Sequence, residues 1–283
     1  MSEAVEQGEE TGALRPQAIL LTFLGGYLLR RGVHVATSSL VDVLRRAGVS
    51  EHATRSTVSR MARRDQLHRV RRGRQVYVGP TDDTRAVLRD GEARMWRTEA
   101  VNEHWDGSWT LLSFSLPDAW ARERHLLRAR LVWAGFGPLQ GGLWIAPGTR
   151  DVAGLGDGLG EGAGLAGRLR AFSAQALEPT DVDALVRDAW DLPALAARYE
   201  AFLARWGDAA ARPRLDPLAA QLLLEADWLQ AIRRDPRLPR RHLPADWPAG
   251  PAHALFRELH ATYEPGARDG VAALDVLPDT DAM

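Results

Sequence analysis

The sequence contains no cysteine, which excludes disulfide bonds, thiol nucleophiles and cysteine-based zinc sites. It also contains no lysine, so all 36 basic residues are arginines, whose planar donor forks can bind phosphate or guanine through two hydrogen bonds. No apolar run approaches the roughly 18 to 20 residues that a membrane-spanning helix needs. The polar start MSEAVEQGEETG does not resemble a secretory signal. We therefore expect a cytoplasmic protein whose core is held by hydrophobic packing alone.

Sequence motifs of common enzymes are equally scarce. G-x-S-x-G is missing, the eight histidines include no H-E-x-x-H, and a P-loop cannot form without lysine. GAGLAG at 162–167 fits G-x-G-x-x-G, but a dinucleotide site needs a hydrophobic strand directly before that motif. The preceding DVAGLGDGLGE cannot form such a strand and is typical of a flexible loop. We predict no catalytic residues, no metal site and no resident cofactor.

Positive charge is concentrated near the N-terminus, although the formal net charge is only −1. Residues 1–11 contain four acidic residues, and 1–12 are predicted to form a disordered acidic tail. Residues 12–80 then contain thirteen arginines and three acidic residues. Within them, RSTVSRMARRDQLHRVRRGRQVYV at 55–78 holds eight arginines, one aspartate and no glutamate. Such a segment in a near-neutral chain indicates a module that binds a polyanion.

The periodicity of residues 14–64 predicts three helices. The first covers about 14–31, the second begins near Thr37 or Ser38 and ends at Gly48, and Ser50 can cap a third over 51–64. The short turn between the last two is typical of a helix-turn-helix. An alternative is a solvated surface helix with ion pairs, but acidic partners are scarce. We expect the third helix to read DNA bases in the major groove through its outward residues Arg55, Ser56, Ser59, Arg60, Arg63 and Arg64.

Two short β-prone runs follow this helix and flank a glycine turn at RRGR, which predicts a hairpin. A basic hairpin directly after a recognition helix is a wing. Residues 13–80 are therefore predicted to form a winged helix-turn-helix domain. Its wing would contact phosphates or the minor groove through Arg71, Arg72 and Arg74.

The remainder of the chain predicts further regions. Residues 81–104 are predicted to form a polar linker helix that acts as a solvated spacer or a dimer element. The order strand, helix, strand, loop, strand predicts an α+β domain over 105–179. Residues 180–265 are predicted to be helical, and 266–283 to be a tail.

Six segments occur in an order that resembles one known family. They are LRPQAILLTFLGGYLLRRG, GVSEHATRSTVSRMARRDQL, WDGSWTLLSFSLP, WAGFGPLQGGLWIAP, AWDLPALAARYEAFLARW and RDPRLPRRHLPADWP. Together they resemble the PaaX-type transcriptional regulators, the repressors of phenylacetic acid degradation. The resemblance implies an α+β protein with an N-terminal winged helix, a central ferredoxin-like domain and a C-terminal helical domain. It also implies a homodimeric repressor that leaves double-stranded operator DNA when it binds an aryl-CoA thioester, typically phenylacetyl-CoA or another acyl-CoA.

An acyl-CoA effector would need an apolar slot for its acyl group and cations for its phosphates. The candidates for the slot are Trp105, Trp109, Trp133 and Trp144, and those for the cations are Arg122, Arg124, Arg128 and Arg130. The alternative is that the tryptophans are ordinary core residues and the arginines are solvated.

A second function class follows from the resemblance of this type of ferredoxin-like domain to a small CRISPR-adaptation nuclease. Such an enzyme would bind its metal through an aspartate near the end of the first strand, where Asp118 is the nearby candidate. One carboxylate placed after a proline is weak support for a metal site.

Overall fold

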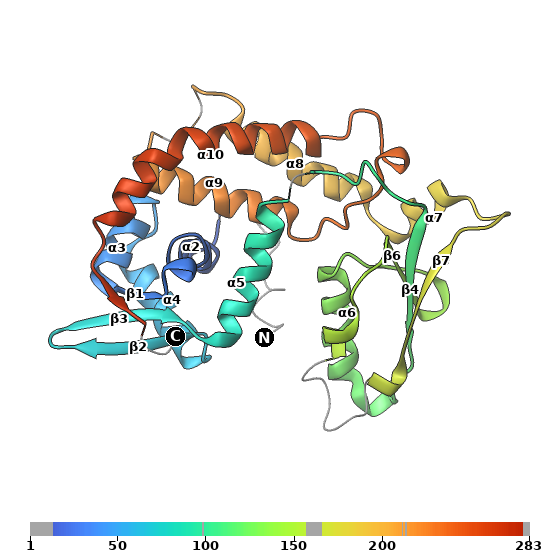
Figure 1. Ribbon diagram of the computed structural model, residues 1–283, viewed down its shortest axis with the longest axis horizontal. Helices are drawn as coiled ribbons and strands as arrows, with labels where there is room; N and C mark the ends of the chain where they lie inside the picture. The colour runs from blue at the N-terminus through green and yellow to red at the C-terminus, as the bar shows by residue number, and fades with distance from the viewer. Residues whose placement is uncertain (1–13, 98, 157–165, 211, 213, 280–283) are drawn as a thin grey trace. The chain divides into compact units, whose positions relative to one another are not determined.

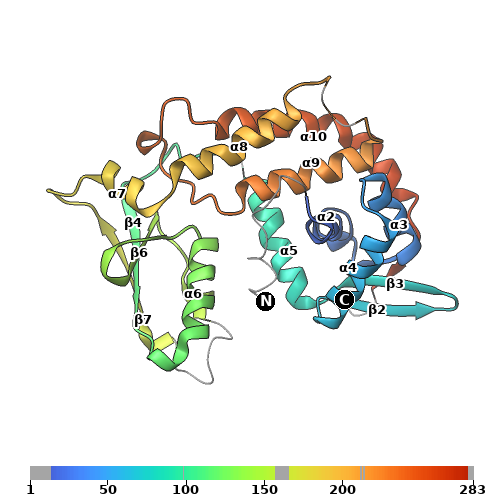
Figure 2. The ribbon, with the colours of Figure 1, turned by 180° about the vertical axis from the view of Figure 1, so that it is seen from behind.

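The computed structural model describes residues 14–97, 99–156, 166–210, 212 and 214–279, which form two compact units (Figures 1 and 2). The winged-helix unit contains 14–97, 201–232 and 251–279, and the central unit contains 99–200 and 233–250. The predicted acidic tail at 1–12 lies outside the described residues, as does most of the glycine-rich loop. No helix within the described ranges is both long and apolar enough to cross a membrane.

The winged-helix unit packs helices around a small antiparallel sheet. Its helical elements are α2 (Pro16–Phe23), the π-helical turn η1 (Leu24–Leu28), η2 (Leu29–Arg31), α3 (Thr37–Arg46), α4 (Glu51–Arg63), α5 (Asp82–Met95) and α9 (Pro217–Ile232), together with parts of α8 (Leu192–Trp206) and α10 (Ala249–Ala272). Its strands are β1 (Val33–Ala36), β2 (Leu67–Arg72), β3 (Gln75–Pro80) and β8 (Val276–Pro278), arranged in the order β2-β3-β1-β8. The predicted helix-turn-helix and hairpin are therefore present, in the predicted order.

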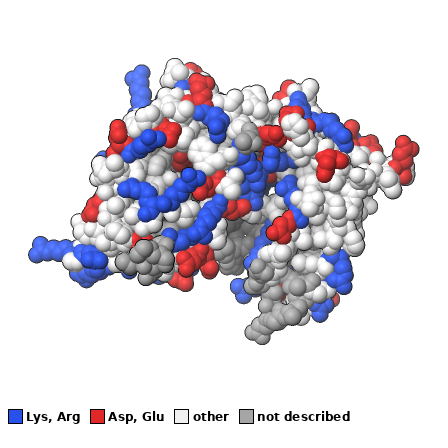
Figure 3. Space-filling view, in the orientation of Figure 1, with Lys and Arg blue, Asp and Glu red and all other residues white. Residues whose placement is uncertain are grey.

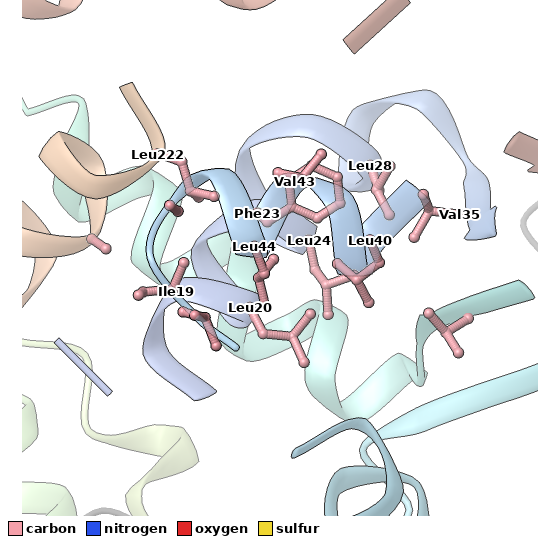
Figure 4. Packing of buried hydrophobic residues seen from close by; sticks show 14 of the residues in the cluster. Ile19, Leu20, Phe23, Leu24, Leu28, Val35, Leu40, Val43, Leu44 and Leu222 are labelled. Carbon is pink, nitrogen blue, oxygen red and sulfur yellow. The ribbon is translucent and has the colours of Figure 1, made fainter. Parts of the chain in front are cut away.

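Leucines from distant parts of the chain share the core of this unit (Figure 4). Leu20 and Leu24 from the first helical segment meet Leu44 of α3, and none of the three is exposed to solvent. α9 adds Leu222, which is also completely buried. Burying a leucine side chain stabilises the fold by about 1.5–3 kcal/mol. α9 therefore contributes to the stability of the winged-helix unit.

Two predictions about the rest of this unit are wrong. The segment 81–104 is predicted to be a solvated spacer or a dimer element, and the first of these is wrong, because Leu88 and Met95 of α5 are 7% and 6% exposed and Leu88 packs on Gly25 of η1. The predicted tail from 266 is also incorrect as far as residue 279, because α10 continues to Ala272 and β8 follows it. β8 pairs with β1 antiparallel, with Val35 opposite Val276.

The central unit contains the predicted α+β arrangement. Its strands are β4 (Ser108–Phe114), β5 (Gly137–Pro138), β6 (Leu143–Pro147) and β7 (Leu169–Gln175), in the antiparallel order β5-β6-β4-β7. Its helical elements are η3 (Asp118–Trp120), α6 (Ala121–Trp133), η4 (Gln140–Gly142), η5 (Ala153–Gly156), η6 (Ala166–Arg168), α7 (Val182–Ala189), η7 (Arg240–His242) and the start of α8. This strand order is that of a ferredoxin-like sheet. Between β6 and β7, the described residues contain two short 3₁₀ turns where such a fold carries its second helix.

The predicted helical region 180–265 does not form a separate compact unit. α7, the first part of α8 and 233–250 belong to the central unit, whereas α9 and most of α10 belong to the winged-helix unit.

Two glycines of the winged-helix unit give a matched test of its packing. A β-carbon at Gly79 would lie 2.5 Å from Cδ2 of the buried His34, whereas one at Gly91 in α5 would meet nothing within 4 Å. We expect Gly79→Ala to lower the free energy of unfolding by about 1–3 kcal/mol through overpacking. Gly91→Ala should raise it by about 0.5–1 kcal/mol, because alanine loses less backbone entropy in a helix. Urea unfolding followed by circular dichroism measures both, and a Gly79→Ala protein as stable as the wild type would contradict the packing described for His34.

Candidate nucleic-acid interface

The turn before α4 fixes the direction of this helix. Gly48 has φ +85°, a backbone conformation that favours glycine, and its N–H donates to the carbonyl of Arg45 over 3.0 Å. Ser50 then caps α4, because its Oγ accepts a hydrogen bond from the N–H of Ala53 over 3.2 Å. A serine at position 50, just before the helical periodicity begins, was sufficient to predict the start of the helix.

One side of α4 is buried and the other carries the predicted polar residues. Thr54, Val58 and Met61 are 0%, 3% and 1% exposed, so they anchor the helix to the core. On the opposite side, four arginines are exposed and two serines are half-buried: Arg55, Arg60, Arg63, Arg64, Ser56 and Ser59. The division between the two sides follows the predicted helical periodicity.

Two arginines of α4 are oriented by neighbours one helical turn before them. Arg55 donates from Nε to a Glu51 carboxylate oxygen over 2.7 Å, and both side chains are more than half exposed. Arg60 donates from its two terminal nitrogens to Ser56 Oγ over 2.6 Å and to Thr57 Oγ1 over 3.0 Å. A guanidinium fork that is already oriented loses less conformational entropy when it forms a bidentate contact.

The wing presents its charges differently. β2 and β3 pair from Leu67 opposite Pro80 to Arg72 opposite Gln75, and Gly73 makes the turn at the tip with φ +60°. Every residue from 71 to 76 is exposed, whereas Tyr77 to Pro80 at the base of the hairpin are buried. Arg71 donates to the carbonyl of Gly73 over 3.2 Å. Figure 3 shows positive charge at the end of this projecting hairpin, where Arg71, Arg72 and Arg74 lie.

The eight residues proposed for an effector site form two groups within the central unit, one of six on or beside α6 and one made of Trp105 and Trp109. Trp144 is 6% exposed and packs in the hydrophobic cluster that also contains Leu127 of α6, and Trp133 lies at the C-terminal end of α6. Among the arginines of α6, Arg124 donates to the carbonyls of residues 116 and 117, and Arg130 donates to that of residue 155. Arg122 and Arg128 are exposed.

Trp105 and Trp109, by contrast, are in contact and belong to a longer row of aromatic rings in the central unit. Their ring centroids are 4.8 Å apart, and Trp190 stacks on Trp109 at 6.3 Å. The guanidinium of Arg241 lies 4.2 Å from the ring centroid of Trp105, and His242 contacts the same ring at 5.3 Å. The sequence analysis missed Trp190, Arg241 and His242, because nothing in the local sequence brings them to Trp105.

Two of these rings also carry unused donors. The indole N–H groups of Trp109 and Trp190 are buried and have no acceptor among the described residues. Buried indole N–H groups usually find a hydrogen-bond partner. The row therefore combines flat apolar faces, two N–H donors and one exposed cation, Arg241.

Asp118, the candidate metal ligand of the nuclease alternative, is exposed and lies 3.7 Å from Arg124. Within the described residues, no three histidine, aspartate or glutamate side chains form a group that could hold a metal ion.

Known proteins match this chain in three consecutive regions. Residues 15–82 match the family described as PaaX-like protein, 102–186 match the PaaX protein central Cas2-like domain, and 190–273 match the PaaX-like protein C-terminal domain. The transcriptional repressor PaaX of Escherichia coli (strain K12) is 29% identical over 262 residues, which cover 88% of this chain and 81% of the relative.

A solved structure has the same fold. The uncharacterized protein Rv0674 from Mycobacterium tuberculosis superposes with a TM-score of 0.57 at 23% identity, over 91% of this chain and 99% of that one. The three family matches follow one another in order along almost all of the described residues. The chain therefore belongs to the PaaX family.

Proposed function

We propose that this protein is a transcriptional repressor that binds double-stranded DNA through α4 and the β2–β3 wing. The observation that carries the proposal is the exposed arginine and serine side of α4, with Arg60 already oriented by Ser56 and Thr57. The 29% identity to a transcriptional repressor supports the same function. In this proposal α4 lies in the major groove and the wing follows the phosphate backbone.

A homodimer is the natural form of such a repressor. Two recognition helices would meet half-sites about 34–36 Å apart on a pseudo-palindrome. The protein would act without catalysis. Incubation with duplex DNA and Mg²⁺ separates this proposal from the nuclease alternative, because a repressor retards the DNA in a gel and leaves it intact.

The two classes of arginine make different contributions to binding. Arg60→Ala should cost about 1–3 kcal/mol and relax the base preference at one position, because a bidentate contact to guanine is lost. Arg74→Ala should leave the base preference unchanged and reduce the slope of log affinity against log salt by about 0.9, because one phosphate contact is lost. The measurements are selection of duplexes from a random pool and fluorescence anisotropy with the duplex that the wild type selects.

Arg187→Ala in α7 is the matched control, since it removes the same charge from an exposed position of the central unit. It should bind like the wild type. Equal salt slopes for the Arg60 and Arg74 variants, with an unchanged base preference in both, would contradict the division between base and phosphate contacts.

We propose further that an aryl-CoA thioester such as phenylacetyl-CoA releases the repressor from its operator. The support is the family resemblance, together with the aromatic row of Trp105, Trp109 and Trp190 beside Arg241. In this proposal the aryl group stacks on Trp105, and the indole N–H groups of Trp109 and Trp190 donate to an acyl oxygen. Release requires the effector to bind the DNA-free state more tightly than the DNA-bound state.

Phenylacetyl-CoA at saturation should weaken wild-type binding to the selected duplex by about 5- to 150-fold, the usual range of allosteric coupling, whereas phenylacetate or free CoA alone should not. Trp105→Ala should bind the duplex normally and lose this response, because the stacking face is removed. Trp133→Ala, at the end of α6, should keep it. An unchanged anisotropy titration of the wild type at saturating thioester would overturn the effector proposal and leave the DNA-binding proposal intact.

A further inference from the structure

Asp275 lies between α10 and β8 and makes contacts with three elements of the winged-helix unit. Its N–H donates to Ser39 Oγ in the first turns of α3 over 3.3 Å. Its carbonyl accepts from the N–H of Ala36, at the end of β1, over 2.9 Å. Its carboxylate accepts from the hydroxyl of Tyr77 on β3, which is 3.1 and 3.2 Å from the two oxygens. One residue near the C-terminus thus joins the helix-turn-helix to the hairpin.

Tyr77 is the point where the wing leaves the body of the protein. It pairs with Val70 on β2 and with Ala36 on β1, and it is 9% exposed, whereas Val76 just before it is 37% exposed. Thr37 Oγ1 donates to the carbonyl of Val76 over 2.8 Å. Burial, followed by the hydrogen bond to Asp275, raises the pKa of Tyr77, so its hydroxyl remains a donor at neutral pH.

The segment that carries Asp275 is anchored at its other end as well. Asp279 follows β8 and is 7% exposed. Its carboxylate pairs with Arg85 of α5, and its N–H donates to the carbonyl of Gly32 over 2.8 Å. Leu274 and Val276, on either side of Asp275, pack against the hydrophobic core. The position of Asp275 is therefore fixed by pairing, packing and an ion pair.

A two-stranded hairpin is at best marginally stable by itself in water. On the tip side of Tyr77, every residue from 71 to 76 is exposed, so the direction of the wing is determined at its base. An acidic residue close to a DNA-binding surface weakens DNA binding by charge repulsion. The hydrogen bond to Tyr77 gives a reason for an aspartate at this position.

We propose that Asp275 is a positioning residue for DNA binding, which acts through Tyr77 to hold the wing so that Arg71, Arg72 and Arg74 reach the phosphates. The inference rests on the proposed function of the wing. It makes the C-terminal segment part of the DNA-binding domain, although Asp275 itself does not touch DNA.

The test uses the full chain, with fluorescence anisotropy on the duplex that the wild type selects from a random pool. Tyr77→Phe removes the hydrogen bond without changing the charge. It should weaken binding by about three- to tenfold. It should also reduce the slope of log affinity against log salt, because each phosphate contact of the wing contributes about 0.9 to that slope and a misplaced wing forms these contacts for less of the time. Asp275→Ala should do the same, although the loss of a negative charge would by itself strengthen binding.

Three controls separate positioning from other effects. Asp275→Asn keeps an acceptor for Tyr77 and should bind at least as tightly as the wild type. Asp269→Ala removes an exposed acid from α10 and reports the effect of charge alone. In a background that lacks Arg71, Arg72 and Arg74, Tyr77→Phe should have no further effect, because the two changes act on the same contacts.

The outcomes are distinguishable. If removal of the three wing arginines weakens binding but Tyr77→Phe binds like the wild type, or if Tyr77→Phe adds its full effect in the wingless background, the positioning role is overturned and the proposed function stands. If removal of the three arginines has no effect, the proposed role of the wing is wrong and the positioning role with it. Thermal unfolding of each variant shows that the comparison is made on folded protein.

Discussion

The arginine side chains of α4 and the wing repel one another, so other contacts have to hold this surface in its folded conformation. The arrangement of the winged-helix unit depends on those contacts. The segment 55–78 contains eight arginines and a single acidic residue. Within this segment, α4 is anchored through its buried side, because Thr54, Val58 and Met61 pack in the core. The hairpin has no such support beyond its base. Apolar packing therefore stabilises one half of the surface, and contacts at the base stabilise the other.

The packing that supports α4 comes from more than the first 80 residues. Leu218 and Leu222 of α9 and Val271 of α10 are 1%, 0% and 7% exposed within the same core, and β8 completes the sheet beside β1. A fragment that ended after the wing would expose these apolar contacts and leave an edge of β1 unpaired. The DNA-binding unit is consequently built from both ends of the chain, and the C-terminal segment belongs to its structure.

The sequence was most informative where long, regular elements determine the fold. The helical pattern located α3 and α4 and divided the two sides of α4 correctly, because periodicity over several turns needs no partner to be visible. β1 and β8 were missed because strands of four and three residues have no recognisable alternation and exist only through their pairing. α5 was assigned to a solvated spacer or dimer element because arginines and acidic residues alternate along it, and the burial of Leu88 and Met95 depends on tertiary packing. The row formed by Trp105, Trp190 and Arg241 depends on tertiary packing alone.

All basic residues of this protein are arginines, but the arginines of α4 and those of the wing have different hydrogen-bond partners. On α4, Arg60 is bonded to two hydroxyls and Arg55 to a carboxylate, so each fork is oriented before DNA arrives. A base edge must replace these partners with hydrogen bonds of equal quality, and only a guanine offers two acceptors in the matching geometry. At the wing tip, Arg71 is bonded to a backbone carbonyl of its own turn, and the phosphates that it would meet are the same at every base pair. Specificity is therefore expected from the oriented arginines of the helix, and sequence-independent affinity from the exposed arginines of the wing.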